Sequence, residues 1–283
     1  MAASLKDDGD DDNEIVIHYD VEQQTAEWDE IRRPVSGTKG DLFGLSSFDD
    51  SKTAYERTIS GVPKEFSERA KLSMQHGVKF EPRSADKIKE ILRHQRFEGR
   101  VEDRLIALWK NQKWIDNPGY DVPNPSTHPI FNEVGDDKRF GVSLDMRGEH
   151  IDVEIKNPVN IWNFKNYYFD MLSPERFFQL QWAMAIRNRD SMFLFATCYD
   201  EHTEELKACV VWYVMFRRDF MVEHVVPRAR ILADAILAKG ENFDVSKCNL
   251  KTVFEPNYYD VFEEEYSMQF MLHASRIYFW GVK

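Results

Sequence analysis

The sequence predicts an α/β protein in which a central mixed β-sheet is flanked by helices. Two apolar runs rich in Phe, Val and Trp, at residues 192–199 and 206–216, are typical of buried strands joined by a polar turn. A third β pattern lies upstream at residues 140–155, and helical patterns precede, separate and follow these strands. Helices and strands in this order are typical of the α/β class.

The length of 283 residues indicates one large domain or a domain with appendages, and 42% hydrophobic residues are enough for a sizeable core. We expect a disordered tail at residues 1–14, which are acidic and of low complexity. We expect a single domain at residues 15–283. Within it, the aromatic stretch 253–283 is expected to pack on the rest of the chain or on a partner subunit.

Several features indicate an intracellular protein rather than a secreted or membrane-bound one. No run of about 18 apolar residues is present to cross a membrane, and the acidic N-terminus lacks the apolar centre of a signal peptide. The three cysteines, Cys198, Cys209 and Cys248, are too few and too scattered for a disulfide framework or a zinc site. A reduced, intracellular protein follows.

The net charge of −12 argues against a protein that coats nucleic acid with a basic surface. Residues 1–14 carry one Lys, five Asp and one Glu, a sum of −5, which leaves −7 for the rest of the chain. An acidic protein still binds DNA where its basic groups line one channel. Charge alone therefore neither supports nor excludes DNA as a partner.

Helical patterns fill the first part of the chain. A short helix is expected at 23–33, before a proline, and further helices are expected at 51–60 and 63–93. In the last of these, four apolar residues at helical spacing are expected in the core, and an internal Gly and Pro predict a kink or a break near Glu81. The four apolar residues are Phe66, Ala70, Met74 and Val78.

Basic and aromatic residues are interleaved at 96–114. Such a segment either tracks a phosphate backbone and stacks on bases, or is amphipathic with its tryptophans in the core, which is the interpretation that we prefer. A loop rich in Pro and Asn follows at 117–129. The interleaved residues are Arg96, Arg100, Arg104, Lys110 and Lys113 with Phe97, Trp109 and Trp114.

A small-residue loop at 35–41 directly follows Arg32 and Arg33. It is either an ordinary connection or an anion site. In the second case, the two arginines and the nearby hydroxyl groups would hold a phosphate through charge-assisted hydrogen bonds. The polar residues of the loop are Ser36, Thr38 and Lys39.

Residues 139–181 carry the candidate chemistry. Asp145 ends an apolar run, a glycine turn follows, and 151–155 alternates apolar and polar residues as a half-buried strand does. Glu154 and Lys156 are two residues apart on this strand, so both side chains leave the same face. A hairpin would bring Asp145 beside them.

Two acids and a lysine at one sheet edge suit the hydrolysis of phosphodiesters. The carboxylates would hold Mg²⁺, which prefers oxygen ligands and which would activate water and offset charge in the transition state. The lysine would orient or deprotonate that water. A surface hairpin with adjacent acid and base is the alternative, because the pattern is short and its residues are abundant.

The remaining elements follow this hairpin. Residues 159–172 read as an aromatic, irregular connection, and a helix is expected at 174–186, with Ser173 as its cap and a proline in its first position. A long helix is expected at 217–239, and Gly240 would end it.

These motifs and their order resemble the phage-type alkaline exonucleases, the family of bacteriophage lambda exonuclease and the YqaJ-type viral recombinases, which have the PD-(D/E)XK nuclease fold. The resemblance spans about residues 28–237. Its central motif is Ser-Leu-Asp at 143–145 followed by Glu-Ile-Lys-Asn-Pro at 154–158. Leu144 and Asn157 stand where the family usually has Pro and Cys, and neither change removes a metal ligand.

Three further motifs carry the resemblance. Gln179 corresponds to a glutamine that the family places in the active site, while Arg176 replaces the tyrosine that commonly precedes it by three residues. Glu81 resembles an additional acidic residue near the metals, so we expect it to face the site rather than solvent. Arg32 resembles the arginine that binds the 5′-phosphate of the recessed strand. The other residues of this phosphate site would be Ser36, Thr38 and Ser143.

The resemblance implies a Mg²⁺-dependent 5′ to 3′ exonuclease that degrades one strand of double-stranded DNA from its ends, for recombination or viral DNA processing. Asp145 and Glu154 would be the main metal ligands, and Glu81 and the Ile155 carbonyl further ones, for one or two Mg²⁺ ions with Mn²⁺ as a substitute. Lys156 would activate or position the attacking water. The implied catalytic residues are Asp145, Glu154, Lys156, Gln179 and Glu81.

The resemblance also leaves alternatives open. Herpesvirus members of this fold act as endonucleases and cut RNA, and a non-catalytic DNA-binding relative is a third class. A single-strand annealing protein is an implied partner, and no membrane is. The chain would form either a closed ring with further copies of itself or a monomer, because relatives of both kinds exist. The implied location is the cytoplasm of a bacterial host, or the cytoplasm or nucleus of a eukaryotic host cell.

Overall fold

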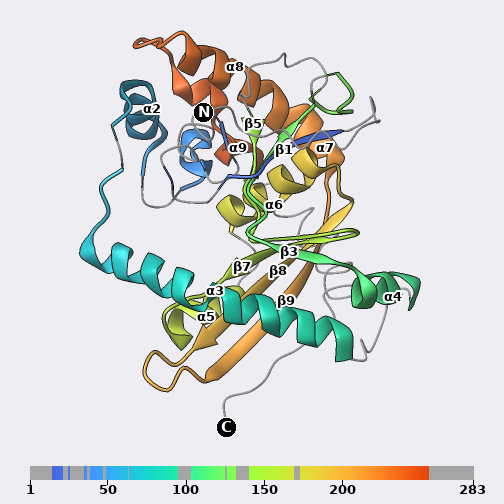
Figure 1. Ribbon diagram of the computed structural model, residues 1–283. Helices are drawn as coiled ribbons and strands as arrows, with labels where there is room; N and C mark the ends of the chain where they lie inside the picture. The colour runs from blue at the N-terminus through green and yellow to red at the C-terminus, as the bar shows by residue number, and fades with distance from the viewer. Residues whose placement is uncertain are drawn as a thin grey trace.

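The computed structural model describes residues 15–21, 25, 35–36, 39–46, 49–62, 64–94, 103–124, 126–131, 140–168 and 173–254 (Figure 1). The expected disordered tail at 1–14 lies outside these residues. So do all but one residue of the expected helix at 23–33, and nearly all of the aromatic stretch at 253–283.

A five-stranded sheet lies at the centre of the molecule, in the order β3-β6-β7-β8-β9. β7 and β8 run parallel while every other neighbouring pair is antiparallel, so the sheet is mixed, as the sequence predicts. The apolar runs predicted as strands form β8 and β9. The strands are β3 (Trp114–Asp116), β6 (Met146–Gly148), β7 (Asp152–Lys156), β8 (Ser191–Tyr199) and β9 (Leu206–Met215).

Two pairs of short strands lie outside the central sheet. β1 (Val16–Tyr19) pairs antiparallel with β4 (Tyr120–Pro123), and β2 (Val35–Ser36) pairs parallel with β5 (Phe140–Gly141). The apolar run at 140–144 is therefore not one strand of the hairpin. Its first residues pair with β2, and the chain enters the central sheet only at β6.

Helices cover both faces of the central sheet (Figure 1). On one face, α3 (Glu68–His94) and α4 (Asp103–Asn111) pack against a core that includes Phe193 of β8. On the other face, α6 (Pro174–Arg187) packs against a core that includes Leu194. Because successive strand residues point to opposite faces, these two neighbours of β8 belong to different cores.

Further helices surround these layers. Tyr55 of α2 (Ser51–Ser60) donates its hydroxyl to the carbonyl oxygens of Ala235, in α8 (Val226–Leu237), and Gly240, at 3.1 and 3.0 Å. The remaining helical segments are η1 (Gly40–Phe43), α5 (Ile161–Tyr168), α7 (Arg218–Phe220), the π-helical η2 (Met221–Val225), η3 (Val245–Cys248) and α9 (Lys251–Phe254).

One prediction about α3 is wrong. Its first half was expected to supply core residues, but Phe66 just before it and Met74 and Val78 within it are 41%, 53% and 52% exposed. This half extends beyond the sheet (Figure 1), and the buried apolar residues of α3 begin only at Phe80. Of the kink or break predicted near Glu81, the break is excluded, because α3 runs without interruption from Glu68 to His94. Proline removes a single N–H donor, and the packing of the second half against the sheet holds the helix continuous.

Other expectations need smaller corrections. The connection at 159–172 contains helix α5, and the helix at 217–239 includes the π-helical turn η2. Lys239, with φ of 47°, provides the left-handed residue after α8 that the sequence assigned to Gly240. Strand β7 is buried on both faces rather than half-buried. The three cysteines are buried and form no disulfide.

None of the helices in the described part of the chain is both long and apolar enough to cross a membrane.

Candidate active site

Asp145 lies where β6 begins and β7 ends. The pair Met146 and Val153 is the register point between these strands, so Asp145 stands just outside the ladder. Its Oδ2 accepts a hydrogen bond from the backbone N–H of Ile155 at 2.6 Å. The hairpin therefore brings Asp145 beside the strand that carries Glu154 and Lys156, as predicted.

Glu154 is the centre of the site. The residue is 4% exposed, and its Oε1 accepts hydrogen bonds from Lys156 Nζ and from Gln179 Nε2, the latter at 2.6 Å. Both donors bind the same oxygen. Within the described residues, these contacts leave Oε2 as the atom of Glu154 that a metal ion would use.

Helix α6 holds Gln179 in this position. The Ser173 side chain accepts a hydrogen bond from the N–H of Arg176, and a proline occupies the first turn, as the sequence predicts. Phe177, Phe178 and Leu180 are buried on either side of Gln179. The helix is thus fixed against the core while one polar residue faces β7.

Glu81 approaches the site from α3 and is half-buried. Its carboxylate accepts a hydrogen bond from the side chain of Asn117, and it is close enough to Glu154 and Lys156 for both to act on its pKa. The structure thus brings five of the predicted residues together. They are Glu81, Asp145, Glu154, Lys156 and Gln179.

The electrostatics of this cluster favour a bound cation. Burial raises the pKa of Asp145 well above its ordinary value, and the charge of Glu154 raises it further. Burial also raises the pKa of Glu81, against the lowering effect of its hydrogen bond with Asn117. Burial acts to lower the pKa of Lys156, but attraction to Glu154 and Asp145 outweighs it and raises that pKa. Three carboxylates face one ammonium, a formal charge of −2 when all are ionised.

The donor set fits Mg²⁺ or Mn²⁺, since it consists of carboxylate oxygens. The N–H of Ile155 points towards Asp145, and the N–H and C=O of one strand residue point the same way, so the Ile155 carbonyl faces Asp145 as well. Within the described residues, however, no three acidic, His or Cys side chains are already gathered around one metal position. Metal binding would therefore draw the carboxylates closer together.

Two residues of the site were not predicted. Asn117 has a left-handed backbone (φ 46°), donates its N–H to the carbonyl of Asp145 at 2.8 Å, and hydrogen-bonds Glu81. The Asn-Pro-Gly turn after Ile115 and Asp116 was the available signal, but it reads as an ordinary loop. Tyr167 of α5 is the second, because it is close enough to Lys156 to raise the pKa of that residue.

Arg176 explains how Tyr167 is held. The guanidinium carbon lies 3.9 Å from the centre of the Tyr167 ring. The backbone carbonyl of Tyr167 also accepts a hydrogen bond from Trp212 Nε1 at 2.6 Å. Arg176 stands where the resembled family has a tyrosine, and here it positions a tyrosine from a different helix next to the site.

Asn157 is another departure from the pattern of the resembled family, and its side chain links α3 to the end of β7. Its side-chain oxygen accepts hydrogen bonds from Ser84 and Thr197, and its nitrogen donates to the carbonyl of Gly77 at 3.2 Å. These contacts fasten α3, which carries Glu81, to the end of β7.

The predicted phosphate site is described only in part. Ser36 of β2 lies opposite Gly141 of β5. Gly141 is two residues before Ser143, which is half-buried, so the two serines lie on neighbouring chain segments. Arg32 and Thr38 lie outside the described residues. The phosphate site therefore stays a prediction.

The preferred interpretation of residues 96–114 holds for Trp109 and in part for Trp114, which packs against the same core. Trp109 is 2% exposed and packs edge-on against Phe193 in the core. Trp114 is only half-buried, and its neighbour Lys113 is exposed. Arg96 and Arg100 lie outside the described residues.

Comparisons with known proteins give a distant likeness. No protein-family model matches the sequence, and no curated protein is found similar to it. The chain is similar to the structure of an alkaline exonuclease, LHK-Exo, from Laribacter hongkongensis, with 18% identity and a TM-score of 0.47, over 76% of this chain and 92% of that one. LHK-Exo in complex with dAMP matches with 16% identity and a TM-score of 0.47, over 87% of this chain and 100% of that one.

Both matches are alkaline exonucleases, the proteins that the sequence motifs resemble. A likeness of this size does not carry a functional conclusion. That conclusion depends on the side chains at the end of β7.

Proposed function

We propose that this protein is a metal-dependent deoxyribonuclease that hydrolyses phosphodiester bonds at the end of β7. The observation that carries the proposal is the buried Glu154, bound on one oxygen by both Lys156 and Gln179 and flanked by Asp145. The pKa values of Asp145 and Glu81 beside it are raised by burial, and carboxylates with perturbed pKa values cluster at functional sites. The alternative, a surface hairpin with adjacent acid and base, does not fit the burial of these carboxylates.

Asp145, Glu154, Glu81 and the Ile155 carbonyl would hold one or two Mg²⁺ ions, with Mn²⁺ as a substitute. When bound, such ions lower the pKa of a bound water and offset charge on the phosphoryl oxygens. Gln179 keeps the Glu154 carboxylate in place.

Lys156 acts as a positive charge rather than as a base in this mechanism. Its raised pKa keeps the ammonium protonated at neutral pH, so it cannot take a proton from water until Glu154 is otherwise neutralised. A protonated Lys156 can donate hydrogen bonds to the attacking water and to a phosphate oxygen. Of the two roles that the sequence allowed, orientation of water is the one that the electrostatics favour.

We further propose that the substrate is the end of a DNA duplex and that degradation runs 5′ to 3′, leaving a 3′ single strand for recombination or viral DNA processing. The support is the sequence resemblance, together with the position of Ser36 next to the chain segment that carries Ser143 and Asp145. A phosphate held there would lie near the carboxylates. A single-strand annealing protein and further copies of this chain in a ring are the partners that fit such a reaction.

Digestion of end-labelled linear duplex and closed circular duplex DNA with Mg²⁺ tests this function. We expect early release of the 5′ label from linear DNA and no cutting of the circle. Cutting of the circle would show an endonuclease, and first release of the 3′ label would reverse the polarity. DNA binding without cutting would show a non-catalytic relative.

A further inference from the structure

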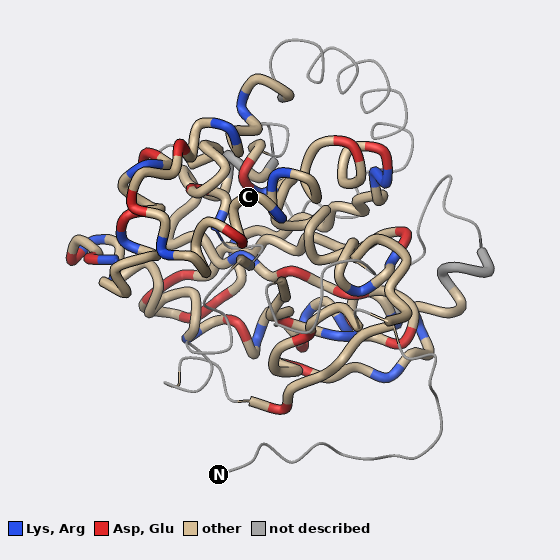
Figure 2. Tube along the Cα trace, turned by 90° about the horizontal axis from the view of Figure 1, so that it is seen from above, with Lys and Arg blue, Asp and Glu red and all other residues tan. Residues whose placement is uncertain are grey.

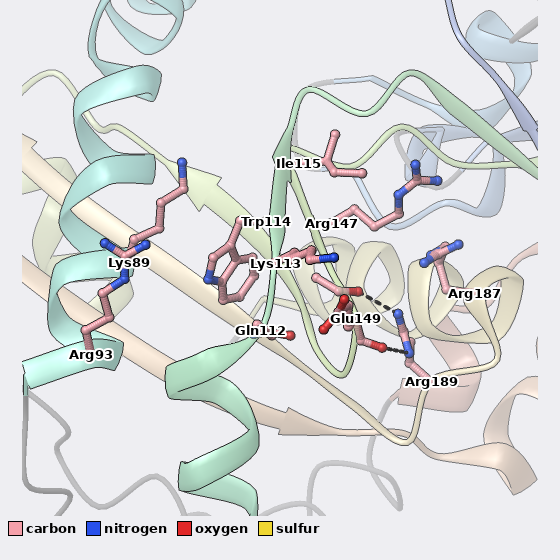
Figure 3. Close-up of a pocket in the computed structure, with 11 residues that line it drawn as sticks. Lys89, Arg93, Gln112, Lys113, Trp114, Ile115, Arg147, Glu149, Arg187 and Arg189 are labelled. Carbon is pink, nitrogen blue, oxygen red and sulfur yellow. Dashed lines mark hydrogen bonds between the residues drawn. The ribbon is translucent and has the colours of Figure 1, made fainter.

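A hollow of about 750 Å³ opens at the edge of the central sheet, around strand β3 (Figure 3). Six basic residues and a single acidic one, Glu149, line it together with Gln112 and Trp114. Over the described trace as a whole, Lys and Arg are interspersed with Asp and Glu (Figure 2). This hollow is thus a local concentration of positive charge in a chain of net charge −12. Its basic residues are Lys89, Arg93, Lys113, Arg147, Arg187 and Arg189.

Four of these cations are held by buried or nearby acids. Arg147 and Arg187 contact Asp121 at 3.4 and 3.3 Å, and Arg187 and Arg189 contact Asp152 at 3.3 and 3.2 Å. Lys89 contacts Asp116 at 2.6 Å. These ion pairs build the wall of the hollow, and their charges are largely balanced. The four cations held in these ion pairs are Lys89, Arg147, Arg187 and Arg189.

The other two cations are available to a ligand. Arg93, in the last turn of α3, and Lys113, just before β3, are exposed, and neither has an acidic partner within the described residues. In Figure 3, Arg93 lies on one side of the Trp114 indole, while Arg147 and Arg189 lie on the other.

Two uncharged side chains indicate what kind of anion would fit. Trp114 is half-buried and presents an aromatic ring inside the hollow. Gln112 is 6% exposed and its Oε1 accepts hydrogen bonds from the N–H groups of His150 and Ile151, which fixes the orientation of the amide. Its Nε2 is buried and has no partner among the described residues. Unpaired cations beside a flat aromatic ring are the features of a site for single-stranded nucleic acid.

We propose that this hollow binds a single-stranded segment of the DNA substrate, with phosphates at Arg93 and Lys113 and a base stacked on Trp114. A paired base inside a duplex is stacked on its own neighbours, so an indole on the wall selects an unpaired one. The proposal rests on the proposed nuclease function, because that function supplies a DNA strand nearby. Trp114 is three residues from Asn117 along β3, or about 10 Å at 3.3 Å per residue. A few nucleotides would therefore connect the hollow to the carboxylates.

Binding of a labelled single-stranded oligonucleotide, measured by fluorescence anisotropy in EDTA over a series of salt concentrations, tests this site. The double variant Arg93→Ala with Lys113→Ala should make the negative slope of log K against log salt shallower by about 1.4, since each phosphate contact on a single strand contributes about 0.7 to its magnitude. Trp114→Leu, which keeps an apolar side chain against the core, should weaken binding on the order of tenfold.

Matched controls carry the same charge change elsewhere. Lys52 on α2 is 79% exposed, and Lys71 in the first turn of α3 is 53% exposed. Lys71 is 22 residues from Arg93 along one helix, or about 33 Å at 1.5 Å per residue. The double variant Lys52→Ala with Lys71→Ala should keep the wild-type slope. Thermal unfolding of Trp114→Leu verifies that it is folded, and the charge variant changes only exposed residues.

Two outcomes would overturn the proposal. One is a slope for Arg93→Ala with Lys113→Ala equal to that of the control. The other is that the pocket variants lose as much affinity for blunt duplex DNA as for the single strand, because that result would make the hollow a duplex site. Hydrolysis of the small phosphodiester bis(p-nitrophenyl) phosphate, which needs no strand, should be unchanged in the pocket variants. If the wild type binds the single strand here but hydrolyses neither DNA nor bis(p-nitrophenyl) phosphate, the proposed nuclease function is wrong and the proposed binding site is still supported.

Discussion

Replacing Gln179 by Met separates a role in the site from a role in the fold. Gln179 Nε2 donates to Glu154 Oε1 at 2.6 Å, and Met fills a similar volume without a donor. Glu154 would keep its contact with Lys156 but lose the contact that comes from α6. We expect a folded protein whose carboxylate is less well fixed.

The size of the effect follows from the kind of hydrogen bond that is lost. A hydrogen bond to a charged group contributes about 1.5–3 kcal/mol. Each 1.36 kcal/mol is a factor of about ten in rate, so the loss is about tenfold to a hundredfold if the bond is needed in the transition state. Removing a partner of a metal-ligating group has an effect of the same order on metal affinity.

Gln181→Met is the matched control, because Gln181 lies on the same helix and makes hydrogen bonds away from the site. It is fully buried, donates to the carbonyl of Met215 at 2.8 Å and accepts from the N–H of Arg217 at 2.7 Å. Its replacement removes both hydrogen bonds, at about 0.5–1.5 kcal/mol each. Gln181→Met should therefore lose stability but keep its rate per folded molecule.

The assay is the initial rate of nucleotide release from linear duplex DNA over a series of Mg²⁺ concentrations, with the folded fraction of each variant taken from thermal unfolding. Gln179→Met should be slower and should need more Mg²⁺ for half its maximal rate. A wild-type rate and Mg²⁺ dependence for Gln179→Met would refute the assignment of this residue. So would an equal loss of rate per folded molecule in Gln181→Met.

Three further predictions follow from the site. The pKa of Asp145 is raised in the folded state, so its ionisation destabilises the metal-free fold as pH rises above the ordinary value of 3.8. Asp145→Asn should therefore be more stable than the wild type to urea at neutral pH in EDTA, while inactive, and an equal or lower stability would contradict this. Ca²⁺ should support DNA binding but little cleavage, because its coordination is looser, and rapid cleavage in Ca²⁺ would argue against a Mg²⁺ site of defined geometry. The wild type should cut 5′-phosphorylated ends about tenfold to a hundredfold faster than 5′-hydroxyl ends, and Arg32→Ala should lose this preference. A preference that survives Arg32→Ala would move the phosphate contact to Arg33 or Lys39.

The central hairpin was predictable because its signals are local. A two-residue spacing fixes which strand residues share a face, so Glu154 and Lys156 had to be neighbours whatever the rest of the chain did. The continuous apolar run of β8 and the Ser173-Pro174 start of α6 are equally local. These elements are confirmed.

The position of α3 relative to the sheet was not predictable in the same way. A helical apolar stripe shows that one face seeks a partner, but not how far along the helix the partner extends. Met74 and Val78 recur at helical spacing with each other, but they are six and two residues from the buried Phe80, so at about 100° per residue they lie on other faces of the helix. Burial there is decided by tertiary contacts, which a spacing pattern does not contain.

Asn117 and Tyr167 were missed for a related reason. Each comes from a segment without chemistry of its own, a turn after β3 and a connection that forms α5. They join the site only because β3 pairs with β6 and α5 packs near the end of β7. The resemblance directed attention to the position of Arg176, whereas the hydroxyl near Lys156 comes from Tyr167.

The most direct test of the proposed chemistry compares the wild type with Glu154→Gln in the release of nucleotides from linear duplex DNA with Mg²⁺. The substitution keeps the shape of the side chain and removes the charge that binds Lys156 and would bind the metal. The wild type should release nucleotides, and Glu154→Gln should be slower by about a thousandfold, because a metal ion supplies several kcal/mol of transition-state stabilisation. Equal release by the two proteins would contradict the assignment of this site to phosphodiester hydrolysis.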